Sequence, residues 1–152
     1  MNQTLLKKSA VQKATAQDCN LYVLVTHQRN LWLDIKKNDK TGLVETQIIG
    51  RRSNLGKDSK SEAVEMIRQK LGIEISPNDL IEKSFTNFPD KLNSVSQKCK
   101  VYQINLSSSQ NSKIKSETKK AFDLDYIKSE FAPEGMPLKP ISSNILKQIK
   151  IV

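Results

Sequence analysis

An almost entirely apolar run, LYVLVT at positions 21–26, restricts the fold of this chain more than any other segment. Neighbouring side chains in a β-strand point to opposite faces of the sheet, so a strand without polar alternation is expected to be buried on both sides. We therefore predict that this strand lies inside a sheet whose two faces are both covered.

Two more strands are predicted directly after this run. HQRN is a turn signal, and LWLDIKK at 31–37 then alternates between apolar and polar residues. The apolar face of this strand carries Leu31, Leu33 and Ile35. NDKTG interrupts the chain, and LVETQII at 43–49 predicts a third strand ending at Gly50. Trp32 lies on the more polar face, where it either stacks on a ligand or covers the edge of the core.

The helix that follows is the best-specified element of the sequence. Ser59 and Glu62 form an S-x-x-E pattern, which predicts a capping box, and Gly72 predicts a left-handed helix end. The residues between them place one apolar stripe along the helix: Ala63, Val64, Ile67 and Leu71. Asp58, just before the pattern, is expected to cap the helix rather than to bind a metal.

The second half of the chain adds two strands and a final helix. KVYQINL at 100–106 predicts a strand, and KAFDLDYI at 120–127 predicts a short strand running into a turn. Between them, SSSQNSKIKS at 107–116 is interpreted as a polar, basic surface loop. Two prolines then precede SSNILKQIKI at 142–151, which predicts a helix. The residues expected to dock this helix are Ile145, Leu146 and Ile149.

Strands and helices mix here without regular β-α-β alternation, which indicates an α+β domain or a sheet between helices. The length of 152 residues accommodates one domain with a substantial core, and we assign this domain to 18–152. Residues 1–17 contain three lysines and no acid, and are predicted to form a basic arm. This arm is either a frayed terminus or a targeting sequence, although it lacks the arginines typical of transit peptides.

The net charge of +9 and the isoelectric point near 9.6 favour an anionic partner, whether RNA, DNA or an acidic protein surface. The alternative is a charge that serves solubility alone. Two cysteines, Cys19 and Cys99, without a CxxC pattern and with a single histidine, exclude the usual zinc sites. We expect both thiols to be reduced and partly buried.

No apolar run approaches the roughly eighteen residues that cross a bilayer, and no secretory signal is apparent. We therefore expect no insertion into a membrane. An intracellular location is expected, cytoplasmic or alternatively mitochondrial.

The segment GRRSNLGKDSKSEAVEMIRQKLGIEI, at 50–75, resembles the signature of the Nudix hydrolases, G-x5-E-x7-R-E-U-x-E-E-x-G-U, where U is a bulky aliphatic residue. The alignment needs no gap when it is fixed on Gly72 and Ile73. It matches four further positions where the family commonly has a glycine, an alanine or an aliphatic residue, namely Gly50, Gly56, Ala63 and Ile67. Weaker resemblance extends over 20–150. It implies a single-domain α/β/α sandwich with a mixed sheet.

The acidic positions of this signature carry no acid in the chain. Arg51 replaces the second loop glycine of the family, Lys57 replaces the loop glutamate, and Glu65 replaces the arginine. The three helix glutamates are replaced by Met66, Gln69 and Lys70. In the family, carboxylates hold the magnesium that neutralises a diphosphate and orients water. A thioether, a neutral amide and an ammonium group cannot replace hard anionic ligands. We therefore expect no metal, no cofactor and no hydrolysis.

Basic residues occupy the places that face phosphates in the family. The candidates for binding RNA phosphates are Arg51, Arg52, Lys57 and Lys70 at this loop and helix, and Lys113, Lys115, Lys119 and Lys120 in the later basic segment. A helix N-terminus favours anions in any case. The alternative interpretation is a basic, solvent-exposed loop that binds no ligand.

We therefore expect a catalytically inactive, Nudix-like binding or assembly module that is associated with RNA, or is a subunit of a ribonucleoprotein or other large complex. Two alternatives stay open. One is a protein-interaction subunit without direct nucleic-acid contact. The other is a divergent nucleoside diphosphate hydrolase whose metal site has been relocated to Glu62 and a later acid such as Glu117.

Overall fold

A computed structural model describes residues 19–83 and 99–152 of the chain. Its central feature is a six-stranded sheet with the order β4-β5-β1-β3-β2-β6. The strands are β1 (Leu21–His27), β2 (Asn30–Lys37), β3 (Val44–Arg51), β4 (Ile81–Lys83), β5 (Lys100–Asn105) and β6 (Lys119–Asp123). β1 and β5 are parallel, and the other neighbouring strands are antiparallel, so the sheet is mixed. The predicted basic arm at 1–17 lies outside the described residues.

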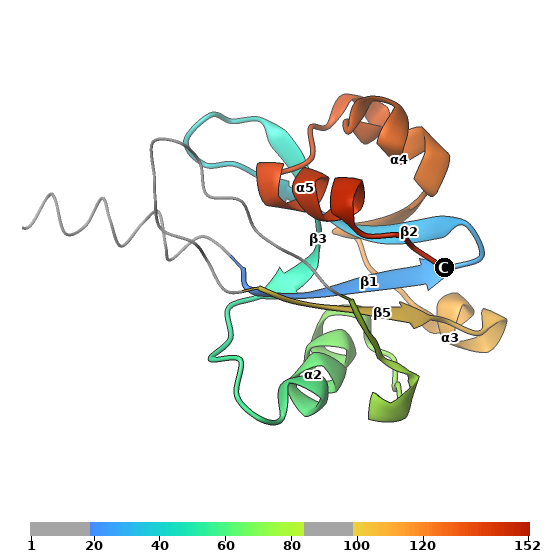
Figure 1. Cartoon of the computed structure of the whole chain (residues 1–152). Coiled ribbons are helices and arrows are strands. Elements are labelled where there is room, and N and C mark those ends of the chain that lie inside the picture. Colours follow the sequence, from blue (N-terminus) through green and yellow to red (C-terminus); the bar gives the residue numbers. More distant parts are fainter. Residues whose placement is uncertain (1–18, 84–98) are drawn as a thin grey trace, which may run out of the picture.

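Helices cover both faces of this sheet (Figure 1). The helices are α2 (Ser59–Leu71), α3 (Ser108–Lys113), α4 (Leu124–Glu130) and α5 (Pro140–Gln148), with short 3-10 turns η1 (Pro77–Asp79) and η2 (Pro133–Gly135). Helix α2 packs against one face, next to β1, while α4 and α5 lie on the opposite face. The predicted α+β domain with a mixed sheet between helices is confirmed.

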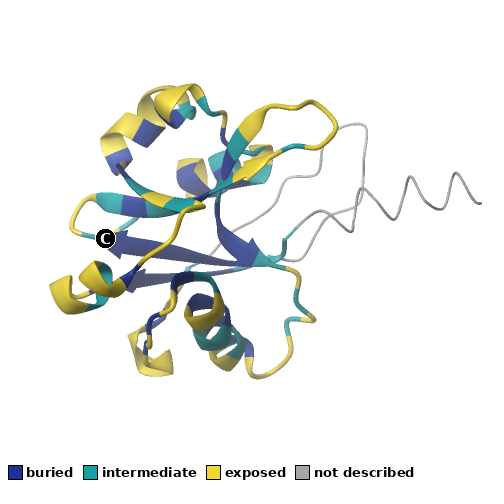
Figure 2. Cartoon of the chain, turned by 180° about the vertical axis from the view of Figure 1, so that it is seen from behind, coloured by how far each residue is buried: buried dark blue, intermediate teal, exposed yellow. Residues whose placement is uncertain are grey.

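The side chains of β1 divide the core into two clusters, one on each face of the sheet. Leu21, Val23 and Val25 pack beneath α2, whereas Tyr22 and Leu24 pack beneath α4 and α5. All of them are at most 1% exposed, and Figure 2 shows the strand buried along its length. The apolar run therefore has the two-sided burial that its composition predicts.

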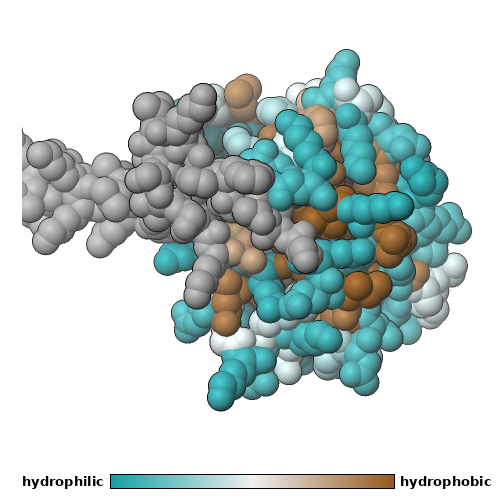
Figure 3. Space-filling view, in the orientation of Figure 1, coloured by the Kyte–Doolittle hydropathy of each residue, from teal (hydrophilic) through white to brown (hydrophobic). Residues whose placement is uncertain are grey.

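The same division explains the other apolar stripes. In α2, Ala63, Ile67 and Leu71 are buried beneath the helix. In the last helical segment Ile145, Leu146 and Ile149 are buried against the opposite cluster, as predicted. Leu43 and Val44 are neighbours in the chain, and the other exposed large hydrophobic residues of the described segments are far from them in sequence: Ile81, Tyr126 and Val152. On the face drawn in Figure 3, hydrophilic side chains interrupt the hydrophobic ones.

The predicted capping box of α2 is wrong. Asp58 occupies the N-cap position, but its side chain makes no capping hydrogen bond. Ser59 lies inside the helix, where its buried hydroxyl is 2.5 Å from the Tyr102 hydroxyl of β5. The side chain of Glu62 turns to the loop before the helix instead. The sequence pattern was misleading because these polar groups found partners in distant elements.

Two predictions for the later segments also need correction. The expected surface loop at 107–116 contains helix α3, which is capped by a reciprocal pair of hydrogen bonds between Ser107 and Gln110. The strand predicted at 120–127 ends at Asp123, and helix α4 follows it in place of a turn. Asp123 caps α4 by accepting a hydrogen bond from the Tyr126 backbone N–H at 3.1 Å.

Two glycines have structural roles near the predicted helix. Gly72 ends α2 with a φ of +70°, which is the left-handed conformation expected of it. Gly50 lies where β3 passes β1 closely, because a Cβ atom there would meet the Leu21 carbonyl oxygen and Tyr22 Cδ1, both at 2.7 Å. Among the described helices, none combines the length and apolar character needed to span a bilayer.

Candidate anion-binding site at the loop before helix α2

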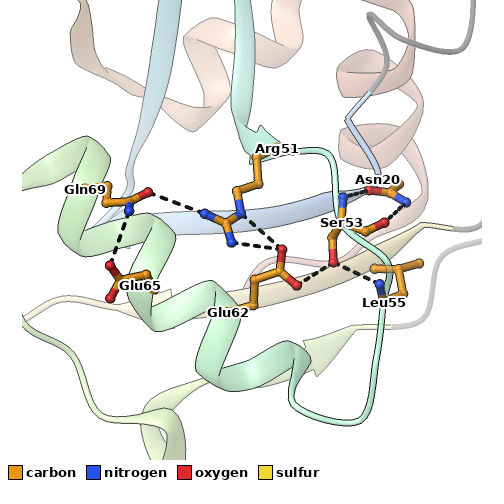
Figure 4. A network of polar contacts seen from close by, with 7 residues as sticks. All are labelled: Asn20, Arg51, Ser53, Leu55, Glu62, Glu65 and Gln69. Atoms are coloured by element: carbon orange, nitrogen blue, oxygen red, sulfur yellow. Dashed lines mark hydrogen bonds and ion pairs between the residues drawn. The ribbon is translucent and has the colours of Figure 1, made fainter.

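The loop from β3 to α2, at 52–58, is fixed by a pair of polar side chains (Figure 4). Asn20 exchanges two hydrogen bonds with the backbone of Ser53, at 2.7 and 2.6 Å. The Ser53 hydroxyl in turn accepts from the Leu55 N–H at 2.9 Å and donates to Glu62 at 2.5 Å. Leu55 adopts a φ of +51°, which is rare for a residue with a side chain. The loop is thus a defined structure.

Arg51 crosses from the end of β3 to the exposed side of α2. Its Nε and NH2 groups lie 3.1 and 3.0 Å from a carboxylate oxygen of Glu62. Its NH1 group donates to the side-chain oxygen of Gln69 at 3.4 Å. The guanidinium group therefore spans two turns of the helix, and Figure 4 shows it between these two partners. Its positive charge is largely compensated by Glu62.

The four signature positions that hold glutamates in the resembled family are divided between core and surface. Met66 is fully buried in the core beneath α2. Gln69 is exposed and joins the guanidinium of Arg51 to Glu65. Lys57 is exposed and Lys70 is half-buried. Neither of these lysines has an ion-pair partner within 19–83 and 99–152.

Glu65 occupies the position where the family has an arginine, and it forms an ion pair on the surface of α2. Its carboxylate pairs with Arg68 at 2.5 Å, one turn along the helix. This hydrogen bond and the carboxylate's charge raise the pKa of Arg68 above its usual value. Two acids and two arginines thus neutralise one another on α2 and β3. Lys57 lies in the loop before α2, whereas Lys70 lies in the last turn of the helix.

The structure divides the later basic candidates among three places. Lys113 is at the exposed end of α3, and Lys115 is exposed in the connection to β6. Lys119, on β6, pairs with Asp34 of β2 at 3.5 Å, and both side chains are largely buried. Lys120 lies over the ring of Phe122 and pairs with Glu134 at 2.8 Å. These four residues therefore do not form one basic loop.

One residue of the later basic segment, Lys119, nevertheless lies on the same face of the sheet as Arg51. Asp34 lies between Gln47 of β3 and Lys119 of β6 in the strand register, four residues along β3 from Arg51. From the spacing of strands and residues, Lys119 lies about 16 Å from Arg51 on the α2 side. Lys120 is the next residue along β6 and points to the opposite face, toward η2. It is therefore separated from the Arg51 loop by the sheet.

Trp32 lies near this face and covers the edge of the core. It is half-buried against the apolar cluster beneath α2, and its indole N–H donates to the Asn111 side chain of α3 at 2.9 Å. This placement supports the second of the two interpretations of Trp32. The pairing of Trp32 with Asn111 had no signal in the sequence, because the two residues are 79 positions apart.

The residues proposed for a relocated metal site lie in different settings. Glu62 is engaged by Arg51 and Ser53, whereas Glu117 is exposed before β6. Among residues 19–83 and 99–152, no three His, Cys, Asp or Glu side chains are grouped so that they could hold a metal ion. The expectation that this protein uses no metal stays a prediction.

Comparison with known proteins identifies the architecture. No protein-family model matches the chain, and its sequence matches no curated protein. Solved structures do match it: a MutT NUDIX hydrolase from Burkholderia pseudomallei has 17% identity, a TM-score of 0.55, and coverage of 86% of this chain and 95% of the other. The fold is Nudix-like.

Two further solved structures share this fold. A NUDIX hydrolase from Nitrosomonas europaea has 9% identity and a TM-score of 0.56, covering 86% of this chain and 87% of its own. The E. coli ORF135 protein has 9% identity and a TM-score of 0.57, covering 84% of each chain. At these identities the likeness concerns the fold alone. The Arg51 loop and α2 are thus parts of a Nudix-like fold.

Proposed function

We propose that this protein is a non-catalytic, Nudix-like binding module that holds a polyanion, and that the polyanion is RNA. The observation that carries the proposal is the chemistry of α2 and its loop. An arginine crosses to the helix, and the positions of the metal-holding glutamates carry Lys57, a buried Met66, Gln69 and Lys70. Cationic side chains could therefore neutralise phosphates without a metal.

The cations of the loop and of α2 have different parts in this proposal. Lys57 and Lys70 bind phosphates directly, because no acid among the described residues pairs with them. Arg52 is exposed at the start of the loop and can join them. Arg51 holds the loop to α2, and a phosphate reaching it would compete with Glu62. Lys113 and Lys115 extend the basic surface beyond α3.

A salt titration with a single-stranded RNA oligonucleotide tests this function. Binding through phosphates releases counterions, so affinity should fall steeply, by one to several orders of magnitude between roughly 50 and 200 mM salt. Fluorescence anisotropy of the labelled RNA gives the dissociation constant at each salt concentration. A flat salt dependence, or no binding at low salt, would remove RNA from the proposal.

A pair of charge reversals then locates the contact. Lys57→Glu combined with Lys70→Glu should weaken binding strongly and lower the slope against salt by about two or more. The matched control is the same charge reversal at Lys128 and Lys147, which are exposed on α4 and α5 across the sheet. Equal losses from both double variants would show that binding depends on the net charge and not on the loop.

A further inference from the structure

Strand β6 forms one edge of the sheet. It pairs with β2 on one side, and no strand of the described segments, 19–83 and 99–152, lies on its other side. The opposite edge strand, β4, has three residues, whereas β6 has five. The backbone N–H and C=O groups of an edge strand can bond a further strand. Strand β6 is therefore the longer of the two edges that a partner strand can extend.

The hydrogen bonds to β2 show which backbone groups of β6 point outward. The Ile35 N–H donates to the Thr118 carbonyl at 2.7 Å, and the Leu124 N–H donates to the Arg29 carbonyl at 2.8 Å. In an antiparallel pair, successive residues alternate between bonding the neighbouring strand and pointing away from it. Because Thr118 and Leu124 both bond β2, the outward groups belong to the odd-numbered residues between them: Lys119, Ala121 and Asp123.

The side chains of β6 complement a reversed copy of the same strand. Its sequence is KKAFD, with Ala121 at the centre. When two copies pair antiparallel about Ala121, Lys119 lies opposite Asp123 of the second copy. Both side chains lie on the α2 side of the sheet, because Ala121 is opposite Trp32 and Lys119 is opposite Asp34 in the register with β2. Opposite charges in such cross-strand positions stabilise a sheet.

The other face of the strand is complementary as well. Lys120 would lie opposite Phe122 of the second copy, and within one chain Lys120 already lies over the Phe122 ring, 5.4 Å from its centroid. Other registers are less favourable. Moving the axis to Lys120 places two ammonium groups opposite each other, which is destabilising. Moving it to Phe122 extends the pairing into helix α4.

The contacts within one chain leave both charged groups able to take a further partner. Asp123 is exposed, and its Oδ1 accepts the Tyr126 N–H at 3.1 Å, while its second carboxylate oxygen has no partner in the described part of the chain. The Lys119 ammonium lies 3.5 Å from Asp34 and donates to the Thr118 hydroxyl at 2.8 Å. An ammonium group has three N–H donors, so Lys119 can also bond Asp123 of a second copy.

We propose that two copies of this protein associate along β6, antiparallel about a two-fold axis at Ala121, and join their sheets into one. This axis is perpendicular to the sheet, so the α2 faces of both copies point to the same side. If the proposed RNA function holds, the dimer presents two candidate phosphate-binding surfaces to one polyanion. Association itself does not require RNA, so its test is separate from that of RNA binding.

Sedimentation velocity of the purified full chain, without RNA, tests the proposal. The sedimenting mass should rise from one chain toward two as the protein concentration increases from micromolar to millimolar. Amide hydrogen exchange should slow at Lys119 and Ala121 over the same range, because their N–H groups enter a ladder. A chain that remains a monomer at millimolar concentration would overturn the proposal.

Two variants locate the interface. Ala121→Pro removes the central outward N–H but no bond to β2, as edge strands allow, and should weaken association roughly tenfold or more. Asp123→Asn keeps an oxygen that can cap α4 and removes the charge opposite Lys119. Because two symmetric pairs lose that charge, association should weaken by roughly 2- to 30-fold.

The matched controls are Ala121→Ser, which keeps the N–H group, and Asp125→Asn, which removes an exposed charge from α4. Both should associate as the wild type does. A dimer that neither Ala121→Pro nor Asp123→Asn weakens uses another surface, and would overturn the assignment to β6. Asp123→Asn and the hydrogen exchange of the wild type decide the question even where the proline variant fails to fold.

Discussion

Arg51 is the residue that most distinguishes this loop and helix from the resembled signature, where a glycine stands. Its side chain joins the end of β3 to Glu62 and Gln69. An arginine fork can bond a carboxylate through two N–H groups, which a lysine in the same place could not do as well. One side chain thus joins α2 to the end of β3, from which the loop departs.

The Arg51 network should contribute measurably to stability. Glu62→Gln removes the charge that compensates Arg51, and we expect it to lower the free energy of unfolding by about 1–2 kcal/mol, since the pair is partly buried. Glu65→Gln is the matched control on the same helix: its pair with Arg68 is more exposed to solvent, so the loss of stability should be clearly smaller. Urea unfolding measures both, and equal losses would contradict this assignment.

Gly50 should tolerate no side chain. Gly50→Ala puts a Cβ atom 2.7 Å from the Leu21 carbonyl oxygen, so β1 and β3 must separate, at a cost of about 2–4 kcal/mol. Gly56→Ala adds the same atom in open space in the loop and should change stability by less than about 0.5 kcal/mol. Thermal melts of the two variants check the contrast, and similar melting temperatures would show that the strand contact is not tight.

At the residue scale, the sequence predicts which residues occupy the signature positions better than it predicts their contacts. Alignment on Gly72 places Lys57 and Lys70 at the signature positions, and the structure puts Lys57 just before α2 and Lys70 in its last turn. The bond of Asn20 to Ser53 could not be predicted, because it joins residues 33 positions apart. Ser59 shows the opposite error: the local pattern predicts a capping role, but its hydroxyl contacts the Tyr102 hydroxyl of β5 instead.

Elements with their own hydrophobic period could be predicted, and elements held by polar contacts could not. The strands β1 and β2 and the helices α2 and α5 each bury a regular set of apolar residues. Helix α3 buries none of its six residues and is formed by its cap and by bonds to other elements. Gln110 donates to the Glu74 carbonyl, and Asn111 accepts from Trp32.

Helix α3 should therefore depend on its cap. Ser107→Ala removes the side chain that accepts from the Gln110 backbone N–H at 3.1 Å, and should destabilise the helix by about 1 kcal/mol. Because Asn111 would then hold the indole less firmly, the fluorescence of Trp32, the single tryptophan, should change. Ser108→Ala, one residue later, is the control. Unchanged fluorescence in Ser107→Ala would show that α3 does not need this cap.

At the scale of the whole molecule, the mixed sheet between helices follows from strand and helix patterns together. The comparisons place this arrangement among Nudix-like folds at identities of 9 to 17%. A core that accepts many apolar residues of similar volume explains how the layers persist at such low identity. The surface chemistry is less constrained, and the loop before α2 is where this chain departs from the resembled signature.

We expect divalent metal ions to leave the stability of the folded protein unchanged. A ligand that binds the folded state alone raises the melting temperature, as the unfolding equilibrium requires. We expect millimolar Mg²⁺ or Mn²⁺ to shift the melting temperature by less than about 1 °C, whereas RNA at low salt should raise it by several degrees. Differential scanning fluorimetry compares the two. Stabilisation by Mn²⁺ that Glu62→Gln abolishes would favour the hydrolase alternative instead.

The position of β5 beside β1 also has a consequence for synthesis of the chain. β1 lies between β3 and β5, and β5 comes from residues 100–105. Until those residues leave the ribosome, one edge of a largely apolar strand has no native neighbour, and such edges recruit other strands. The nascent chain should consequently rely on chaperone protection until its last third has emerged.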